Sequence, residues 1–201
     1  MILVSSFKDV ASIFEQFAGD VKGKTVTFIP TASVVEKVNF FVKSGRKALE
    51  KMGLLVDELD VSTATTEEIT DKLTNNDYIY ITGGNTFFLL QELRKSGADK
   101  VIIREIKSGK LYIGESAGLM VVAPNVEFAN SMDSIKKAPE LDSTEGLGMI
   151  DFYPVPHYTN MPFIKAVTKI IATYGESLVL KPISNHQAIL IHDDDVEIVS
   201  V

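Results

Sequence analysis

Residues 111–118 read Leu-Tyr-Ile-Gly-Glu-Ser-Ala-Gly. An apolar run of strand length enters a Gly-x-Ser-x-Gly turn, and a helix-like segment follows it. In such a strand–turn–helix the serine is held in a strained backbone conformation, with its hydroxyl clear of the sheet. The amide of Ala117, at the helix N-terminus, can point at a negative oxygen that develops nearby. The stretch therefore predicts an α/β fold with Ser116 as candidate nucleophile; the alternative is a glycine-flanked serine that only caps a helix.

Strand-length apolar runs alternate with helix-period segments along most of the remaining chain. We expect strands at 2–5, 25–29, 54–59, 78–82, 111–113, 152–155, 177–180, 188–191 and 196–199, and helices at about 9–17, 34–52, 87–93, 101–107 and 163–174, with a short one starting at 65. This repeated order predicts a mostly parallel sheet with helices on both faces. No internal repeat or linker interrupts the sequence, so residues 1–201 are expected to form a single domain.

Two segments depart from this alternation. The acidic residues 192–195 are typical of a turn between two strands, so we expect a C-terminal antiparallel hairpin at one edge of the sheet. Residues 123–148 lack a clear period and contain several prolines and glycines, which predicts a long, partly structured loop. Such a loop inside a compact domain is often functional, and we expect it to shape a small pocket.

The composition argues against several classes of function. The sequence has no cysteine, which removes disulfides, thiolate metal sites and a cysteine nucleophile. A formal net charge of −7 argues against a nucleic-acid partner. The N-terminus lacks the features of a signal peptide, and no run reaches the ~20 apolar residues of a membrane helix. No metal-ligand spacing occurs either, so we expect a cytoplasmic protein without metal, cofactor or membrane partner.

A second strand, at residues 78–82, ends in Gly83-Gly84-Asn85 before a helix. It delivers free backbone amides to the carboxyl edge of the sheet, where open parallel sheets bind ligands. Gly84 is a candidate second oxyanion donor, because only glycine lets a backbone approach a substrate so closely. Asn85 is expected either to hold substrate or to cap the helix. A phosphate-binding loop does not fit, since the sequence has no Gly-Lys-Ser/Thr.

The candidate base is His157, which follows a predicted strand and Pro156. Only three histidines exist, and His192 lies in the acidic turn, where a solvated side chain is expected. His157 is therefore the leading partner for the Ser116 hydroxyl, by position and by elimination. The alternative is a buried structural histidine.

Three motifs together carry a resemblance to a known family. Residues 81–87 (Ile-Thr-Gly-Gly-Asn-Thr-Phe), 112–118 and 156–160 (Pro-His-Tyr-Thr-Asn), in that order and spacing, resemble the S51 peptidases, which include dipeptidase E and cyanophycinase. The resemblance covers nearly the whole chain. It implies a serine peptidase on a flavodoxin-like sheet, related in architecture to class I glutamine amidotransferases. By this resemblance Ser116 is the nucleophile, His157 the base, and the amides of Gly84 and Ala117 the oxyanion hole.

The sequence departs from the family where the orienting acid is expected after the histidine. The position that matches the family's glutamate is Asn185. An asparagine can accept a hydrogen bond from the imidazole and fix its tautomer, but it cannot offset the charge of an imidazolium. Asp133 is the other candidate, because the family carries an aspartate near this position that bears on activity. It is expected to orient His157, to bind a substrate amine, or to be a solvated loop carboxylate.

Other charged residues bear on the substrate. Glu115 stands where the dipeptidase commonly has an aromatic residue, which implies a different substrate preference. Lys136 and Lys137 are candidate contacts for an acidic substrate, although their loop position favours solvated lysines. We expect hydrolysis of a dipeptide or isopeptide amide through an acyl-enzyme. The alternatives are a weakly active or non-catalytic binding homologue, and a hydrolase of another small amide or ester.

Overall fold

A computed structural model describes residues 1–193 and 195–201. Its main sheet has seven strands in the order β3-β2-β4-β5-β1-β8-β9. The bounds are β1 Ile2–Val4, β2 Thr25–Ile29, β3 Leu55–Glu58, β4 Tyr78–Ile81, β5 Leu111–Glu115, β8 Gln187–His192 and β9 Asp195–Ser200. Strands β1 to β5 are parallel, whereas β8 pairs antiparallel with β1 and β9 antiparallel with β8. The predicted mostly parallel, flavodoxin-like sheet with a C-terminal antiparallel edge hairpin is confirmed.

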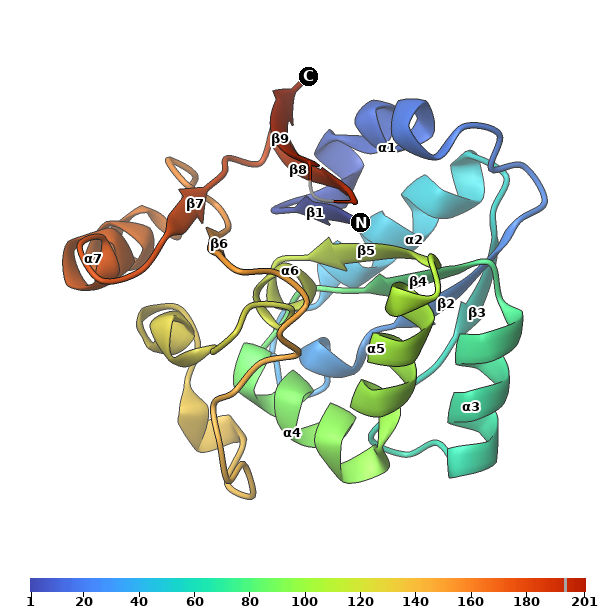
Figure 1. The fold of residues 1–201 in the computed structure, drawn as a ribbon, viewed down its shortest axis with the longest axis horizontal. Helices are drawn as coiled ribbons and strands as arrows, with labels where there is room; N and C mark the ends of the chain where they lie inside the picture. Colours follow the sequence, from blue (N-terminus) through green and yellow to red (C-terminus); the bar gives the residue numbers. More distant parts are fainter. Residues whose placement is uncertain (194) are drawn as a thin grey trace.

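Helices cover both faces of this sheet (Figure 1). The helices are α1 Ala11–Ala18, α2 Phe40–Lys51, α3 Thr66–Asn75, α4 Thr86–Ser96, α5 Ala98–Lys107, α6 Ala117–Met120 and α7 Ile164–Tyr174. Two cores follow from the alternation of side chains along each strand. Ile2 and Val4 of β1 pack with α1 and α2, while Leu3 between them packs on the opposite face with the core of α3, α4 and α5.

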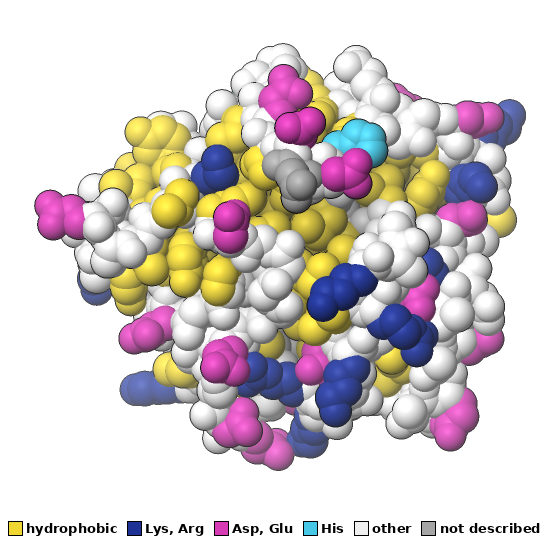
Figure 2. Space-filling model, viewed as in Figure 1, with side chains coloured by type: hydrophobic (Ala, Val, Ile, Leu, Met, Phe, Trp, Pro, Cys, Tyr) yellow, Lys and Arg dark blue, Asp and Glu magenta, His cyan; other side chains and the backbone are white. Residues whose placement is uncertain are grey.

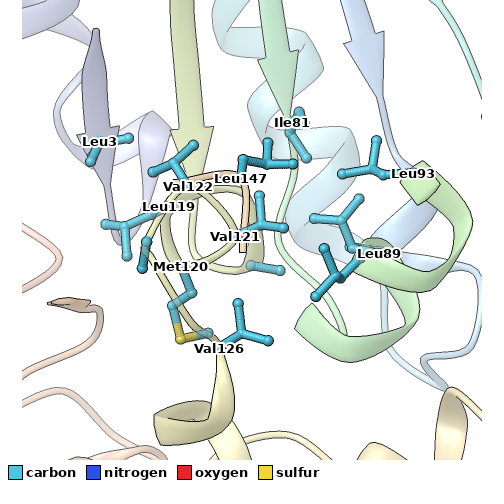
Figure 3. Close-up of a cluster of buried hydrophobic side chains, with 14 of the residues drawn as sticks. Leu3, Ile81, Leu89, Leu93, Leu119, Met120, Val121, Val122, Val126 and Leu147 are labelled. Atoms are coloured by element: carbon cyan, nitrogen blue, oxygen red, sulfur yellow. The ribbon is translucent and has the colours of Figure 1, made fainter. Parts of the chain in front are cut away.

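The short helix α6 lies inside the larger of these cores. Its residues Leu119 and Met120, and Val121 and Val122 after it, are fully buried beside Leu3 of β1 (Figure 3). Because a helix of one turn has little stability of its own, this packing holds α6 in place. The turn that precedes α6 is therefore positioned by the core.

The structure corrects the expected helix at residues 34–52, because α2 begins only at Phe40. A 3₁₀ turn occupies Thr31–Ser33, and the following residues remain irregular. Val34 and Val38, which lie in the first part of the expected helix, are 54% and 57% exposed. Apolar spacing alone does not distinguish a buried face from an apolar surface segment.

A second correction concerns the expected closing strand at 177–180. Strand β7 spans Leu180–Pro182 and pairs in parallel with β6, Tyr153–Val155, in a separate two-stranded sheet. The main sheet has no place for β7 at this edge, because β8 occupies the free side of β1. In the acidic segment 192–195, Asp194 lies outside the described residues, while the strands on either side pair as a hairpin as expected.

The pair β6–β7 and helix α7 stand beside the main sheet rather than on it (Figure 1). On the face shown in Figure 2, acidic and basic side chains are interspersed, and apolar side chains gather where Figure 1 shows α7, β6 and β7. Within the described part of the chain, no helix combines the length and the apolar character needed to span a membrane.

Candidate active site

The parallel strands carry their carboxyl ends to one cavity of about 710 Å³. This size is within the usual range of about 300–1,000 Å³ for sites that bind small organic ligands. The loops after β1, β2, β4 and β5 contribute to its wall, as expected for the carboxyl edge of an open α/β sheet. The lining includes the predicted residues Gly84, Asn85, Ser116, Asp133, His157 and Asn185.

Ser116 occupies the turn between β5 and α6 in a strained conformation, with φ 51° and ψ −98°. Its amide donates to the Val4 carbonyl at 2.9 Å, which ties the turn to β1. Gly114 and Gly118 pack against each other across the turn, and a Cβ on Gly114 would come within 2.5 Å of the Gly118 carbonyl oxygen. The glycines therefore permit the sharp bend that the sequence predicted, and the serine hydroxyl reaches the cavity.

His157 and Asn185 are brought together by the small parallel sheet. The register pairs Val155 of β6 with Pro182 of β7, so the residues just beyond both strands lie side by side. The His157 backbone, at φ 62°, is held by its amide, which donates to the Ser5 hydroxyl at 2.9 Å. The pairing of β6 with β7 explains why His157 and Asn185, 28 residues apart in sequence, are in contact.

The imidazole of His157 bridges two predicted site residues. Its Nε2 lies 3.1 Å from Ser116 Oγ, and its Nδ1 lies 2.8 Å from Asn185 Oδ1. Because Oδ1 is an acceptor, this contact requires the ring proton on Nδ1 and leaves the lone pair of Nε2 facing the serine hydroxyl. Burial lowers the pKa of His157, and the hydrogen bond to Asn185 opposes that shift. The ring is therefore neutral at neutral pH, which is the state of a general base.

An aromatic side chain also fixes the ring. Phe163 stacks on His157 with ring centroids 4.4 Å apart and planes at 17°. Neither Phe163 nor Ser5 was identified from the sequence. Ser5 directly follows β1, so the strand-end rule applied to the first strand would have found it. Phe163 carried no such signal, because its contact depends on how the segment after His157 folds back.

The glycine turn after β4 lies directly against the nucleophile. A Cβ on Gly83 would lie 3.2 Å from the Cβ of Ser116. Gly84 has φ 138°, and a Cβ there would collide with the Ala32 carbonyl, so no other residue fits without displacing the chain. Gly84 borders the cavity; Ala117, in contrast, is fully buried and does not line it.

Asn85 performs the capping role that the sequence left open. Its Oδ1 accepts from the Phe88 amide at 2.9 Å at the start of α4, and its Nδ2 donates to the Ser134 carbonyl at 3.2 Å. The side chain is 1% exposed. Asn85 thus ties the loop after α6 to the glycine turn while it forms part of the cavity wall.

Asp133 is not a solvated carboxylate, and its hydrogen bonds are not to His157. Its Oδ2 accepts from the amide and the hydroxyl of Thr86, at 2.9 and 2.6 Å. Burial raises the pKa of Asp133 to about 6; the Thr86 hydrogen bonds oppose this shift, and nearby Glu36 adds to it. Thr86 stands two residues after Gly84, so the carboxylate and the glycine amide share one rigid helix start. The loop at 123–148 does shape the pocket, as expected, through Asp133 and its neighbours.

Glu115 is a buried carboxylate directly before the nucleophile. Its Oε1 accepts from the Phe7 amide at 2.9 Å, and its Oε2 accepts from the Tyr80 hydroxyl at 2.7 Å. Burial raises the pKa of Glu115, whereas these hydrogen bonds and the Gly83 amide favour the charged form. Glu115 therefore connects the ends of β1, β4 and β5 beneath the cavity. Tyr80 was not identified from the sequence as the partner of Glu115.

Each lysine that lines the cavity has an acidic side chain near it. Lys137 lies 2.7 Å from Glu36, and Lys8 lies 4.0 Å from Asp9. Lys136, the other lysine considered from the sequence, is exposed and does not line the cavity. Among the residues that the structure describes, no group of three or more His, Asp or Glu side chains is placed to hold a metal ion.

Several known proteins are similar to this chain. The profile of peptidase family S51 matches residues 1–199. An uncharacterized peptidase of Listeria innocua is 56% identical over 98% of this chain and 94% of its own length. Peptidase E of a Nostoc species is 31% identical over 68% of this chain and 53% of its own length.

Solved structures are similar to this chain as well. A crystal structure from Listeria monocytogenes, provisionally named a Peptidase E protein, superposes with a TM-score of 0.97 and 53% identity, over 100% of this chain and 97% of that one. A peptidase from an acI-B1 actinobacterium, at 24% identity and a TM-score of 0.74 over 100% of this chain and 86% of that one, shares the fold. The S51 resemblance is confirmed: this chain belongs to peptidase family S51.

Proposed function

We propose that the protein is a serine peptidase that hydrolyses the amide bond of a dipeptide or other short peptide through an acyl-enzyme. One observation carries this proposal. The Ser116 hydroxyl, the His157 ring and the Asn185 amide form a continuous chain of contacts of 3.1 and 2.8 Å at the wall of a cavity. A nucleophile, a base and a group that orients the base are the elements of the serine-hydrolase arrangement.

In the first half of the reaction, Nε2 of His157 takes the proton of the Ser116 hydroxyl while Oγ attacks the carbonyl carbon. The resulting oxyanion accepts hydrogen bonds from the amide of Gly84, which borders the cavity, and from the amide of Ala117, which is buried directly after the nucleophile. When the intermediate collapses, the imidazolium gives its proton to the leaving amine, the C–N bond breaks, and an ester on Ser116 remains. Water then attacks this ester with His157 again as base, which releases the acid and restores the serine.

Asn185 orients the ring in this mechanism, since its Oδ1 holds the proton on Nδ1. It supplies no charge to balance the imidazolium, so we expect a lower turnover than a carboxylate in its place would support. Asp133 is proposed to accept the α-ammonium of the substrate through Oδ1, the oxygen that does not bind Thr86. A carboxylate at this position limits the substrate to a peptide whose free amino group lies close to the scissile bond.

Active-site labelling tests the proposal without a known substrate. A fluorophosphonate should form an adduct on Ser116, located by peptide mass mapping, and Ser116→Ala and His157→Gln should abolish it. Ser44 also lines the cavity, and its hydroxyl donates to the Phe40 carbonyl at 3.1 Å, so Ser44→Ala is the matched control and should still be labelled. A panel of dipeptides and simple esters then separates a peptidase from an esterase.

The neutral Asn185 favours one alternative, a homologue that binds peptides without cleaving them. In that case the folded wild-type protein gives no Ser116 adduct after long exposure, while peptides still bind. An adduct that forms equally fast in His157→Gln would also contradict the proposal, because the hydroxyl would then react without its base.

A further inference from the structure

The cavity wall beside the base is apolar. Phe163 stacks on the His157 ring, and Pro162 and Met161 continue the lining outward from it. The segment before α2 adds Val38, Phe40 and Phe41, and Met132 belongs to the loop after α6. These side chains form what we call the apolar wall: Val38, Phe40, Phe41, Met132, Met161, Pro162 and Phe163.

Part of the apolar wall is open to solvent. Val38, Phe40 and Met161 are 57%, 65% and 77% exposed. Exposed apolar side chains that gather at a cavity indicate a ligand that buries them. Because the wall begins at the face of the His157 ring, a ligand side chain that covers it belongs to a residue next to the scissile bond.

The charges at the cavity do not suit an acidic side chain. Of the two lysines that line the cavity, Lys137 is already paired with Glu36 at 2.7 Å and Lys8 lies 4.0 Å from Asp9; no arginine lines the cavity among the described residues. Glu115 and Asp133, in contrast, accept hydrogen bonds from uncharged groups. An acidic substrate side chain would have to break the Lys137–Glu36 pair, compete with Asp9 for Lys8, or lie near these carboxylates, and each of these lowers its affinity.

We propose, resting on the proposed function, that the substrates are short peptides with a free α-amino group and a large apolar side chain on the first residue. The ammonium pairs with Asp133, and the side chain lies against the apolar wall. Both contacts start from fixed points: Asp133 is held by Thr86 at the start of α4, and Phe163 by the His157 ring. Burial of a leucine or phenylalanine side chain against this wall is sufficient to raise the affinity about 10- to 100-fold over a peptide that lacks it.

Binding to Ser116→Ala tests the inference independently of catalysis, because this variant lacks the nucleophile. Calorimetric titration with Leu-Ala, Phe-Ala, Ala-Ala, Lys-Ala and Asp-Ala should give the first two the highest affinity, at least tenfold above Ala-Ala, with Asp-Ala the weakest. N-acetyl-Leu-Ala should bind more weakly than Leu-Ala. If Leu-Ala binds in this order while wild-type Ser116 takes no fluorophosphonate, the proposed function fails and the inference stands.

Variants of the apolar wall supply the second test of the inference. Phe40→Ala and Met161→Ala, in the Ser116→Ala background, should weaken Leu-Ala and Phe-Ala at least threefold and leave Ala-Ala nearly unchanged. Val34→Ala is the matched control, since Val34 is 54% exposed but does not line the cavity, and it should have no effect. Preference for Asp-Ala, an equal loss for all peptides, or no peptide binding overturns the inference. The inference is also overturned if Phe40→Ala or Met161→Ala changes only the oligomeric state in sedimentation, because the apolar wall is then an interface with a second copy of the chain.

Discussion

Replacing Asn185 with aspartate should make the candidate active site faster. Asp is nearly isosteric with Asn, so the 2.8 Å contact to Nδ1 of His157 is retained while a unit negative charge is added. The centres of the imidazolium and the carboxylate would lie about 4 Å apart, where an effective dielectric of about 20 gives about 4 kcal/mol. This value applies because His157 and Asn185 are half-buried rather than sealed in the interior.

The net gain is smaller, because the carboxylate gives up hydration at the same time. We expect Asn185→Asp to raise the rate of Ser116 modification about 10- to 100-fold, which corresponds to about 1.4–2.7 kcal/mol. In chymotrypsin the reverse change, from Asp to Asn, lowers turnover about 10⁴-fold through a wrong tautomer. Here the wild-type tautomer already suits catalysis, so the change should recover only the electrostatic part.

The assay is the pseudo-first-order rate of fluorophosphonate labelling as a function of pH, with the His157 titration followed by NMR. Burial lowers the pKa of His157 in the wild type, so labelling should stay constant through neutral pH and fall only as the ring protonates in acid. A carboxylate at 185 favours the protonated ring, so the acid limb of Asn185→Asp should move to higher pH. Asn185→Leu, which removes the acceptor, should lower the rate. If Asn185→Asp is no faster and its acid limb does not move while the fold is intact, Asn185 does not act on the ring during reaction.

Three further predictions concern residues around the nucleophile. Because burial raises the pKa of Asp133 to about 6, binding of peptides with a free amino group to Ser116→Ala should weaken below that pH, whereas the added Asp133→Asn change should make binding weak at every pH. Calorimetry that finds the same pH dependence in both variants would contradict the ammonium contact. Gly84→Ala should lower the melting temperature more than Gly97→Ala, because both glycines have positive φ but only at Gly84 does a Cβ collide with backbone. The backbone strain alone costs about 1–2 kcal/mol in either variant. Equal losses of stability by calorimetry would rule out the collision. Glu115→Leu should lower the free energy of unfolding in urea by about 2–6 kcal/mol, because it leaves the Phe7 amide and the Tyr80 hydroxyl buried without an acceptor. Glu115→Gln keeps an acceptor oxygen and should lose clearly less stability. Equal losses in the two variants would show that these hydrogen bonds do not contribute to stability.

Residues close together in the chain were sufficient to predict the main sheet and the nucleophile turn. An apolar strand, a Gly-x-Ser-x-Gly turn and a helix are local features, and the close packing of Gly114 on Gly118 follows from them. The strand-end rule also placed Gly84 and Ser116 at one edge of the sheet; it did not apply in the same way to His157, because β6 belongs to the separate two-stranded sheet. The helix expected at 34–52 was wrong in its first part because periodicity carries no information on whether an apolar side chain is covered.

Tertiary structure decided how the polar groups pair, although the S51 resemblance had already pointed to Asn185 as the partner of His157. Asn185 meets His157 because β7 lies outside the main sheet and pairs with β6. No local pattern in residues 177–182 indicated this pairing. Asp133 binds Thr86 and Glu115 binds Tyr80 across 47 and 35 residues of sequence. Hydrogen bonds of this kind depend on distances of a few tenths of an ångström between separate elements. The sequence determines which groups are available, and the packed core determines which of them meet.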